Sequence, residues 1–383
     1  MNKVLQKSKE KRVSLKISFP INKVIALGVA LFLLMTIGLE LIARTDWIQT
    51  KIPFQAYGTN HVQFEMQLNN FFAFIEENGP PDCIILGTSM PFRGINPEKL
   101  QEAYKERIGK NILCYNLSTA GIHFRDLLFI SMSLAGKVEP NLIIVGTSPF
   151  DFTEGREQSL DTRFTENAWL LYHIGDFSIE GWLIDTSYAF RILKLISYFA
   201  PQGLRFDDDD GVNHAINKWK NQLTPSGFGY TTAIEKNIAK PMNRGETKKF
   251  LEQFGNFTIS KTNLSSLEKI IENYYQNQTD IIIVGMPYDE SMVQIMDEEG
   301  NPHPEQKKLE TFISELDQGI SNIANKFGIP YLRSQISDQI PDDGWRDRYH
   351  LNHIGSPIFS RWLGEYLANA VEAGIIRDPS IKD

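Results

Sequence analysis

The chain has 383 residues, of which 42% are hydrophobic and 22% charged. This composition excludes an intrinsically disordered protein and is enough for one large domain or two ordinary ones. The formal net charge of -8 argues against a nucleic-acid-binding surface, because such a surface needs clustered positive charge.

The N-terminal part of the chain is a basic segment followed by a long apolar one. Residues 1–23 carry seven Lys or Arg residues, and residues 24–43 contain a single charge, Glu40, near the far end. About 20 apolar residues in a helix span a ~30 Å hydrocarbon core, and a basic flank favours the cytoplasmic side. A cleaved signal peptide is the alternative, but no A-x-A cleavage site follows. We expect a single-pass anchor in the membrane lipid bilayer through residues 24–43, with a basic cytoplasmic tail and the main domain outside the cytoplasm.

Residues 44–78 are interpreted as a juxtamembrane segment. They include "VQFEMQLNNFFAFIEENG", whose apolar residues recur at helical spacing until Gly79 and two prolines stop the pattern.

From residue 79 to 383, short apolar runs alternate with helical patterns. The runs are continuous and rich in β-branched residues, as parallel strands buried on both faces are; they lie at 83–86, 112–115, 142–145, 281–284 and 329–332. The helical patterns lie at 97–109, 124–136 and 309–328, and in a last helix that continues to about residue 373. The alternation predicts an α/β fold with a doubly wound, mainly parallel five-stranded sheet, whose cleft lies at the carboxyl ends of the strands.

Residues 151–279 are too many for one crossover and are interpreted as an insertion folded over the mouth of the cleft. The insertion ends in the helical pattern "SLEKIIENYYQN". Its run Asp207–Asp210 lacks the alternating ligand spacing of a calcium loop, so a solvated loop is predicted. Cys83 and Cys114 both lie in predicted strands, where buried free thiols are favoured and a disulfide between neighbouring strands stays open.

Two of the predicted strands end in the same motif. "DCIILGTSMPF" contains Ser89 and "NLIIVGTSPF" contains Ser148. A serine after a strand of a doubly wound sheet lies at the ligand crevice, and a helix start supplies unpaired N–H groups that favour developing negative charge. These are the needs of an acyl-transfer nucleophile. Gly-Thr-Ser alone also fits a simple helix cap, and neither copy matches the G-x-S-x-G elbow.

The C-terminal stretch "GWRDRYHLNHIG" supplies a base for such a serine. Asp347 and His350 are three residues apart, so the carboxylate can orient the imidazole while Nε2 faces the hydroxyl, as serine activation requires. The alternative is that Asp347 or Asn352 only caps the last helix. No CxxC, H-E-x-x-H or phosphate-loop pattern is present, so no metal or cofactor is implied.

These blocks, taken in chain order, resemble those of the SGNH (GDSL-type) hydrolases: "ILGTS", "YNLSTAG", "IIVGTSPFDF" and "DRYHLN". The closer likeness is to the membrane-anchored branch that includes the D-alanyl-teichoic-acid transfer protein and the alginate acetylation proteins. The resemblance covers roughly residues 80–150 and 280–375.

The resemblance implies a role for six residues: a catalytic set of Ser89 (nucleophile), His350 (base) and Asp347 (orienter), and an oxyanion or binding set of Gly121, Asn116 and Ser148. Ser148 stands where the family's third block has an asparagine, and the first block reads Gly-Thr-Ser instead of Gly-Asp-Ser. Pro149 also removes the amide after Ser148. Losing one oxyanion donor costs ~10²–10³-fold in rate, so the departure affects rate more than reaction type.

The resulting hypothesis is a membrane-anchored extracytoplasmic serine acyltransferase or esterase. It would act on an envelope polysaccharide or lipid-linked sugar through a Ser89 acyl-enzyme, beside a membrane-bound O-acyltransferase partner. The alternative is a non-catalytic binding or scaffold subunit on the same fold, which the missing asparagine favours. A third reading, a tethered α/β domain of another kind, leaves Ser89 and His350 apart in space.

Overall fold

The computed structural model describes residues 20–381 except 136, 155–161, 200–210, 237, 239, 241, 256, 298 and 335. Asp207–Asp210 lie outside the described residues, so the solvated loop stays a prediction. The chain divides into two compact units, Met1–Lys51 and Ile52–Asp383, and each is described by itself.

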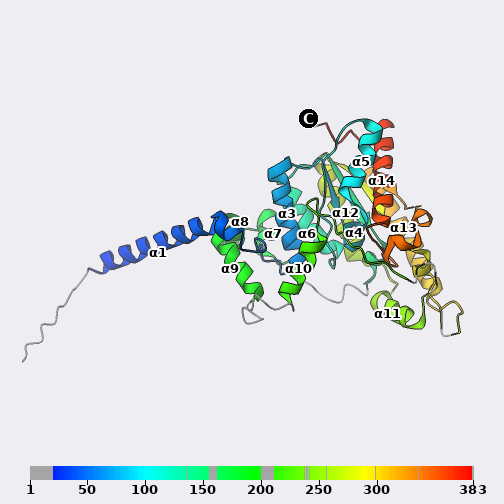
Figure 1. The fold of residues 1–383 in the computed structure, drawn as a ribbon, viewed down its shortest axis with the longest axis horizontal. Coiled ribbons are helices and arrows are strands. Elements are labelled where there is room, and N and C mark those ends of the chain that lie inside the picture. Colours follow the sequence, from blue (N-terminus) through cyan, green and yellow to red (C-terminus); the bar gives the residue numbers. More distant parts are fainter. Residues whose placement is uncertain are drawn as a thin grey trace, which may run out of the picture. The chain divides into compact units, whose positions relative to one another are not determined.

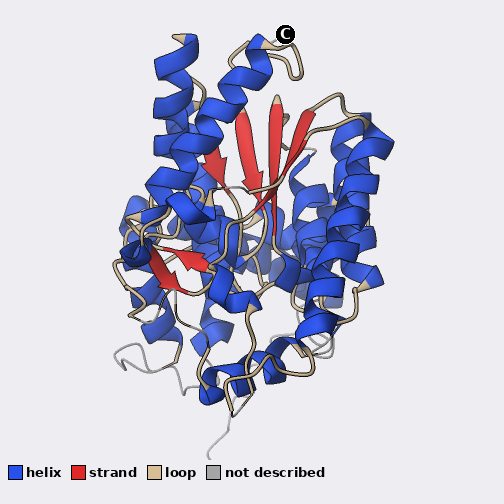
Figure 2. Cartoon of the chain, turned by 90° about the vertical axis from the view of Figure 1, so that its right-hand side faces the viewer, coloured by secondary structure: helices blue, strands red, loops and turns tan. Residues whose placement is uncertain are grey.

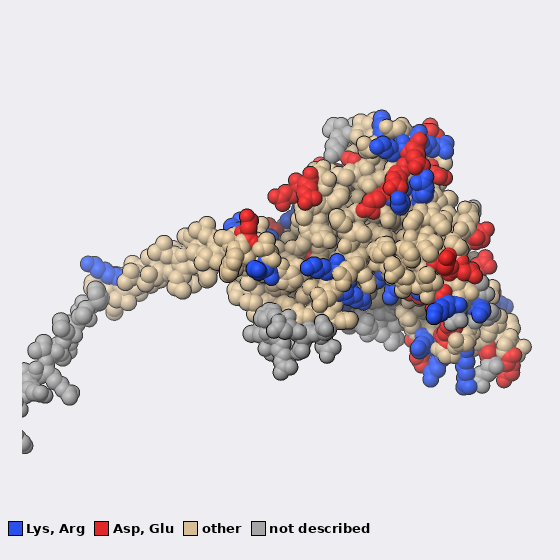
Figure 3. Space-filling view, viewed as in Figure 1, with Lys and Arg blue, Asp and Glu red and all other residues tan. Residues whose placement is uncertain are grey.

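The first unit consists of helices α1 (Ile21–Ala43) and α2 (Asp46–Gln49). The 23 residues of α1 are long and apolar enough to cross a membrane, and the predicted span 24–43 lies within them. Figure 3 shows α1 almost without charged side chains, whereas both signs of charge are spread over the second unit. At the far end of α1, Glu40 pairs with Arg44 at 2.7 Å. The side of the membrane on which the second unit lies stays a prediction.

The second unit is built on the predicted sheet, which is confirmed. Its order is β2-β1-β3-β4-β5 and every neighbouring pair is parallel. The strands are β1 (Cys83–Leu86), β2 (Cys114–Asn116), β3 (Leu142–Thr147), β4 (Asp280–Gly285) and β5 (Tyr331–Leu332). Figure 2 shows helices on both sides of this sheet, with a separate two-stranded hairpin near the end toward which the arrows point. The hairpin consists of β6 (Trp345–Asp347) and β7 (His350–Leu351).

The strands are rich in apolar residues because their two faces enter two different cores. In β3, Ile143 and Val145 belong to one core and Leu142 and Ile144 to the other, and all four are fully buried. The first core is covered by α6 (Phe124–Ala135), α12 (Lys261–Gln276) and α13 (Gln306–Phe327), and the second by α5 (Pro97–Ile108) and α14 (Gly355–Glu372). Helices α5 and α14 run side by side in Figure 1.

Helix α3 (Val62–Asn78) carries the amphipathic pattern of the predicted juxtamembrane segment. Phe64, Leu68 and Phe71 are fully buried in the first core. This helix is therefore packed as part of the second unit, which begins at Ile52.

The polar side of α3 is buried as well. The Gln67 side chain is fully buried, and its Nε2 lies 2.7 Å from Asn116 O, 2.9 Å from Ser118 O and 3.1 Å from Gly227 O. One amide thereby joins α3, the loop after β2 and the insertion.

The insertion is mainly helical where the structure describes it. Its helices are α7 (Ala168–His173), α8 (Ile179–Thr186), α9 (Tyr188–Phe199), α10 (Val212–Gln222) and α11 (Arg244–Phe254). The bridge between Thr153 and Ile259 closes its base. The predicted helix "SLEKIIENYYQN" lies within α12, which packs on α6 as the crossover helix that leads into β4.

The two cysteines face each other across neighbouring strands. Cys83 in β1 is in register with Cys114 in β2, and both are fully buried free thiols. The structure therefore agrees with the favoured interpretation and contains no disulfide between them.

Candidate active site

The two Gly-Thr-Ser motifs lie side by side because β1 and β3 are neighbours in the sheet. Leu86 is in register with Val145, so Ser89 and Ser148 occupy equivalent places, three residues beyond this pair. In the order β2-β1-β3-β4-β5 the direction of winding reverses between these two strands. Ligands bind at this switch point, outside the carboxyl ends of the strands.

The turn after β1 requires glycine. A Cβ on Gly87 would lie 2.3 Å from Pro91 Cγ and 2.8 Å from Gly146 O. The turn leads into the short helix α4 (Ser89–Gly94), so Ser89 is its first residue and is half-buried. The preceding Thr88 donates a buried hydrogen bond of 2.8 Å to Asp151, which ties the turn to the segment after β3.

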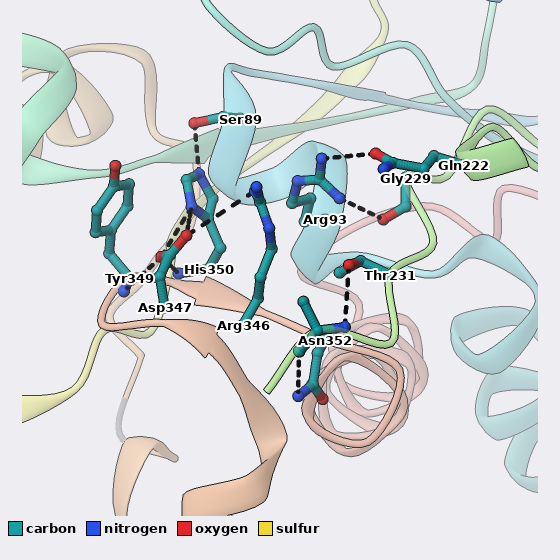
Figure 4. A network of polar contacts seen from close by, with 11 residues as sticks. Ser89, Arg93, Gln222, Gly229, Thr231, Arg346, Asp347, Tyr349, His350 and Asn352 are labelled. Atoms are coloured by element: carbon teal, nitrogen blue, oxygen red, sulfur yellow. Dashed lines mark hydrogen bonds and ion pairs between the residues drawn. The ribbon is translucent and has the colours of Figure 1, made fainter. Parts of the chain in front are cut away.

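The β6–β7 hairpin brings Asp347 and His350 together. The two residues pair across the turn, and Oδ1 of Asp347 accepts from the backbone N–H of Tyr349 at 3.2 Å and of His350 at 2.9 Å. These bonds hold the carboxylate in place. His350 Nδ1 lies 2.9 Å from both carboxylate oxygens, and its Nε2 lies 2.8 Å from Ser89 Oγ (Figure 4). The structure therefore joins the three residues in one hydrogen-bonded chain, and their catalytic role stays a prediction.

The surroundings of the two titratable groups favour a neutral imidazole beside a charged carboxylate. Burial lowers the pKa of His350 below its ordinary value; Asp347 offsets this only in part, and the positive charges of Arg346 and Arg93 lower it further. Burial would raise the pKa of Asp347, but the hydrogen bond and charge of His350, together with the Tyr349 N–H and the charge of Arg346, more than compensate and hold it below its ordinary value. With Nδ1–H donating to Asp347, Nε2 is free to accept the Ser89 proton.

Gly121 lies in the loop that follows β2 and borders the serine turn. Its φ of 79° is in the left-handed region, which favours glycine. Two residues earlier in the loop, Thr119 donates its N–H to Gly87 O at 3.0 Å. This contact places the loop against the turn that carries Ser89. The predicted oxyanion role of Gly121 stays a prediction.

Asn116 is fully buried at the end of β2 and holds α4. Its Nδ2 donates to Pro91 O at 2.9 Å and Ile95 O at 2.8 Å, and its Oδ1 accepts from Ser118 N–H at 3.0 Å. Both amide hydrogens are thus used to position the helix that begins with Ser89. A direct binding role for Asn116 stays a prediction.

Ser148 caps a turn, in contrast to its twin. Pro149–Phe152 form a 3-10 helix, and Ser148 Oγ accepts from Phe150 N–H at 3.3 Å. Ser148 also lines a cavity of about 150 Å³, together with Asp317 and Arg333. The hydroxyl is therefore engaged locally, and its place in an oxyanion hole or acyl pocket stays a prediction.

Asn352 performs the capping that was the alternative reading of this region. Its Oδ1 accepts from Ile354 N–H at 2.8 Å and Gly355 N–H at 3.3 Å, where α14 begins. Asp347 contributes nothing there, because its carboxylate faces His350.

Part of the insertion lies directly at the site. Gly229 N–H donates to Phe92 O at 2.9 Å, and His353 N–H donates to Thr231 O at 3.0 Å. The segment around residues 229–231 therefore runs between α4 and the end of the hairpin. That the insertion folds over the mouth of the cleft stays a prediction.

The sequence analysis missed two arginines at this site. Arg93 is only 2% exposed and comes from α4, one helical turn after Ser89. Arg346 directly precedes Asp347 and lies 3.9 Å from its carboxylate. The spacing of Arg93 from Ser89 was a signal, since residues four apart share one face of a helix.

Fold and site together define an α/β protein with a Ser-His-Asp arrangement at the switch point of its sheet. No protein-family model matches the sequence, and no curated protein is similar enough to match. Among solved structures, a lipase/acylhydrolase from Enterococcus faecalis is 12% identical, with a TM-score of 0.31, over 77% of this chain and 97% of that one. A gut microbial diltiazem-metabolizing enzyme is 11% identical, with a TM-score of 0.32, over 75% of this chain and 46% of that one. These values are too low for either protein's activity to say what this chain does.

Proposed function

We propose that this chain is a membrane-anchored serine acyltransferase or esterase that acts through a Ser89 acyl-enzyme. The observation that supports it is the continuous chain from Ser89 Oγ through His350 to Asp347, with contacts of 2.8 and 2.9 Å. A serine hydroxyl needs such a base to be a nucleophile at neutral pH.

The proposed reaction has two halves. Nε2 of His350 takes the Ser89 proton as Oγ attacks the acyl carbonyl, and the imidazolium returns that proton to the leaving oxygen when the C–O bond breaks. In the second half, an acceptor hydroxyl gives its proton to Nε2 and attacks the acyl-enzyme, and the proton then restores Ser89. Asp347 stabilises the imidazolium in both halves.

The oxyanion that forms in each half needs hydrogen-bond donors. The backbone N–H groups at the start of α4 and that of Gly121 are the proposed donors, because the Gly121 loop abuts the turn before Ser89. Preorganised donors of this kind account for a large share of the rate of acyl transfer.

The acceptor class and the partner are part of the proposal. An envelope polysaccharide or lipid-linked sugar supplies the hydroxyl, and a membrane-bound O-acyltransferase supplies the acyl group. Two observations support this setting: α1 is long and apolar enough to cross a bilayer, and the segment around residue 229 borders α4. An insertion that also covered Ser89 would reduce access of water and favour transfer over hydrolysis. Replacement of the acceptor by water makes the same site an esterase.

The second candidate is a non-catalytic binding or scaffold subunit. The observation that favours it is Ser148, whose hydroxyl caps a turn where the resembling family has an oxyanion-hole asparagine.

The test is covalent labelling of the full-length protein in a non-ionic detergent. The wild type, Ser89→Ala and Ser148→Ala are treated with a fluorophosphonate probe, and intact mass counts the adducts. One adduct that disappears only in Ser89→Ala is the expected result. Loss only in Ser148→Ala would show that the other serine is the nucleophile. No adduct on the wild type would favour the scaffold subunit.

A further inference from the structure

We propose that Arg93, Arg346 and Lys218 form a binding site for an anionic group of the substrate, a phosphate or a carboxylate, next to Ser89. The inference rests on the proposed function, because it names the chemistry of the molecule that the serine would act on. Three cations from three separate parts of the chain carry it: α4, the β6 strand and α10 of the insertion.

Arg93 is a buried cation whose partners are neutral. It is 2% exposed, and its guanidinium lies 2.9 Å from Gln222 Oε1 and 3.5 Å from Gly229 O. Within the described part of the chain, no carboxylate forms an ion pair with it. Burying an unpaired charge costs free energy, so this arrangement needs a reason. An anion brought by a substrate supplies the missing negative charge.

Arg346 extends the positive charge toward the catalytic histidine. Figure 4 shows its side chain between the His350 ring and Arg93. Its one ion pair among the described residues, with Asp347, is long at 3.9 Å, and that carboxylate is already bonded to His350. The Arg346 side chain keeps 34% of its surface exposed, so its planar fork of donors can bind an incoming oxyanion.

Lys218 completes the cluster from the insertion. Helix α10 reaches the site because the ring of Trp219 packs edge-on against Phe92, with centroids 5.8 Å apart. The Lys218 ammonium lies 4.7 Å from the Trp219 ring and the Arg93 guanidinium 6.0 Å from it. Lys218 is exposed, and no described carboxylate pairs with it. Lys218 therefore lies at the solvent-exposed edge of the proposed anion site.

The pKa shifts of Arg93 and Lys218 agree with three cations that lie close to one another. Burial lowers the pKa of Arg93 to about 10; the charge of Arg346 contributes to this shift, and the carboxylate of Asp347 offsets part of it. Burial lowers the pKa of Lys218, and Arg93 and Arg346 lower it further. In the described part of the chain, Asp347 is the carboxylate that interacts with these cations, and the overall charge of the chain is -8. The three side chains repel one another until an anion binds.

The first arm of the test is equilibrium binding to the full-length protein in non-ionic detergent, measured by calorimetry. The probes are methyl phosphate, acetate and the uncharged acetamide. Both anions, or one of them, bind more tightly than acetamide, and the tighter one identifies the group as phosphate or carboxylate. Arg346→Gln weakens this binding at least ~10-fold, as expected for a charged hydrogen bond. Lys218→Gln weakens it up to ~5-fold, as expected for an exposed charge.

The matched control is Lys248→Gln, which removes the same charge from α11. Its side chain is 75% exposed and, among the described residues, pairs with Glu252 alone at 3.8 Å, so anion binding stays at the wild-type value. Equal binding of acetamide and both anions would overturn the inference. So would a loss in Lys248→Gln as large as that in Arg346→Gln.

The second arm compares two esters, p-nitrophenyl acetate and the mono-p-nitrophenyl ester of glutarate. Arg346→Gln lowers the ratio of kcat/KM for the anionic ester over the neutral one by ~10-fold or more. Any change in His350 affects both esters and cancels in the ratio, so an unchanged ratio would contradict the inference. Anion binding without fluorophosphonate labelling would overturn the acyl-enzyme and keep the anion site. Fluorophosphonate labelling without preferential binding of anions would overturn the anion site and keep the acyl-enzyme.

Discussion

Replacing Asp347 by Asn tests one requirement of the proposed mechanism, namely that His350 is held in the tautomer that carries its proton on Nδ1. In the wild type, Oδ1 accepts two backbone N–H groups and Nδ1 of His350 lies 2.9 Å from both carboxylate oxygens. In Asp347→Asn the amide oxygen keeps the backbone bonds and the NH₂ group faces Nδ1. Nδ1 must then accept, the proton moves to Nε2, and Nε2 donates to Ser89 and cannot take its proton.

The expected loss is about 10⁴-fold in the rate of acylation, which corresponds to about 5 kcal/mol of activation free energy. The assay is the rate of fluorophosphonate labelling of the full-length protein across pH. His350 must be neutral to act, so activity falls as the pH drops through its pKa. Asp347 raises that pKa. The residual activity of Asp347→Asn therefore keeps its acid limb at a lower pH than the wild type.

The control is Asp342→Asn, an exposed aspartate just before the hairpin, which leaves the labelling rate unchanged. A rate within tenfold of the wild type for Asp347→Asn would refute the tautomer argument. An equal loss in Asp342→Asn would mean that the hairpin itself is fragile.

Three further changes have expected outcomes. Arg346→Gln raises the pKa of His350, because the arginine charge lowers it, so the acid limb of the labelling profile moves to higher pH; a move to lower pH would contradict the assigned electrostatics. Gly87→Ala forces a Cβ to within 2.3 Å of a proline ring and lowers the free energy of unfolding by ~1–3 kcal/mol, measured by urea denaturation; an unchanged midpoint would show that the turn relaxes freely. Cys83 and Cys114, both fully buried, react with a thiol reagent only after denaturation. Rapid reaction of the native protein would argue against the burial of these two thiols.

The strands could be predicted from the sequence because both faces of the sheet are buried. The run "CIIL" matches β1 at Cys83–Leu86 without a shift. The second strand was placed at 112–115 but begins at Cys114. It is an edge strand, and its ladder starts only opposite Cys83. Hydrophobicity finds an apolar run, but the partner strand decides where pairing begins.

The serine and the Asp347–His350 pair could be placed because each follows a recognisable local pattern. The cations could not. Arg93 enters the site through a packing contact between Phe92 and Trp219, which are far apart in the chain. The polar side of α3 was missed for a related reason, since burial of Gln67 depends on carbonyl groups of distant segments. The hydrophobic periodicity of a short sequence segment does not indicate contacts with distant segments.

The amide of Gln67 has a consequence for how the protein moves. Because it bonds carbonyl groups of both the loop after β2 and the insertion, opening of either segment removes a bond from the same buried amide. Amide protons near Ser118 and Gly227 should therefore exchange with solvent in a common opening event. A ligand that held one of these two segments in place would then slow the opening of the other.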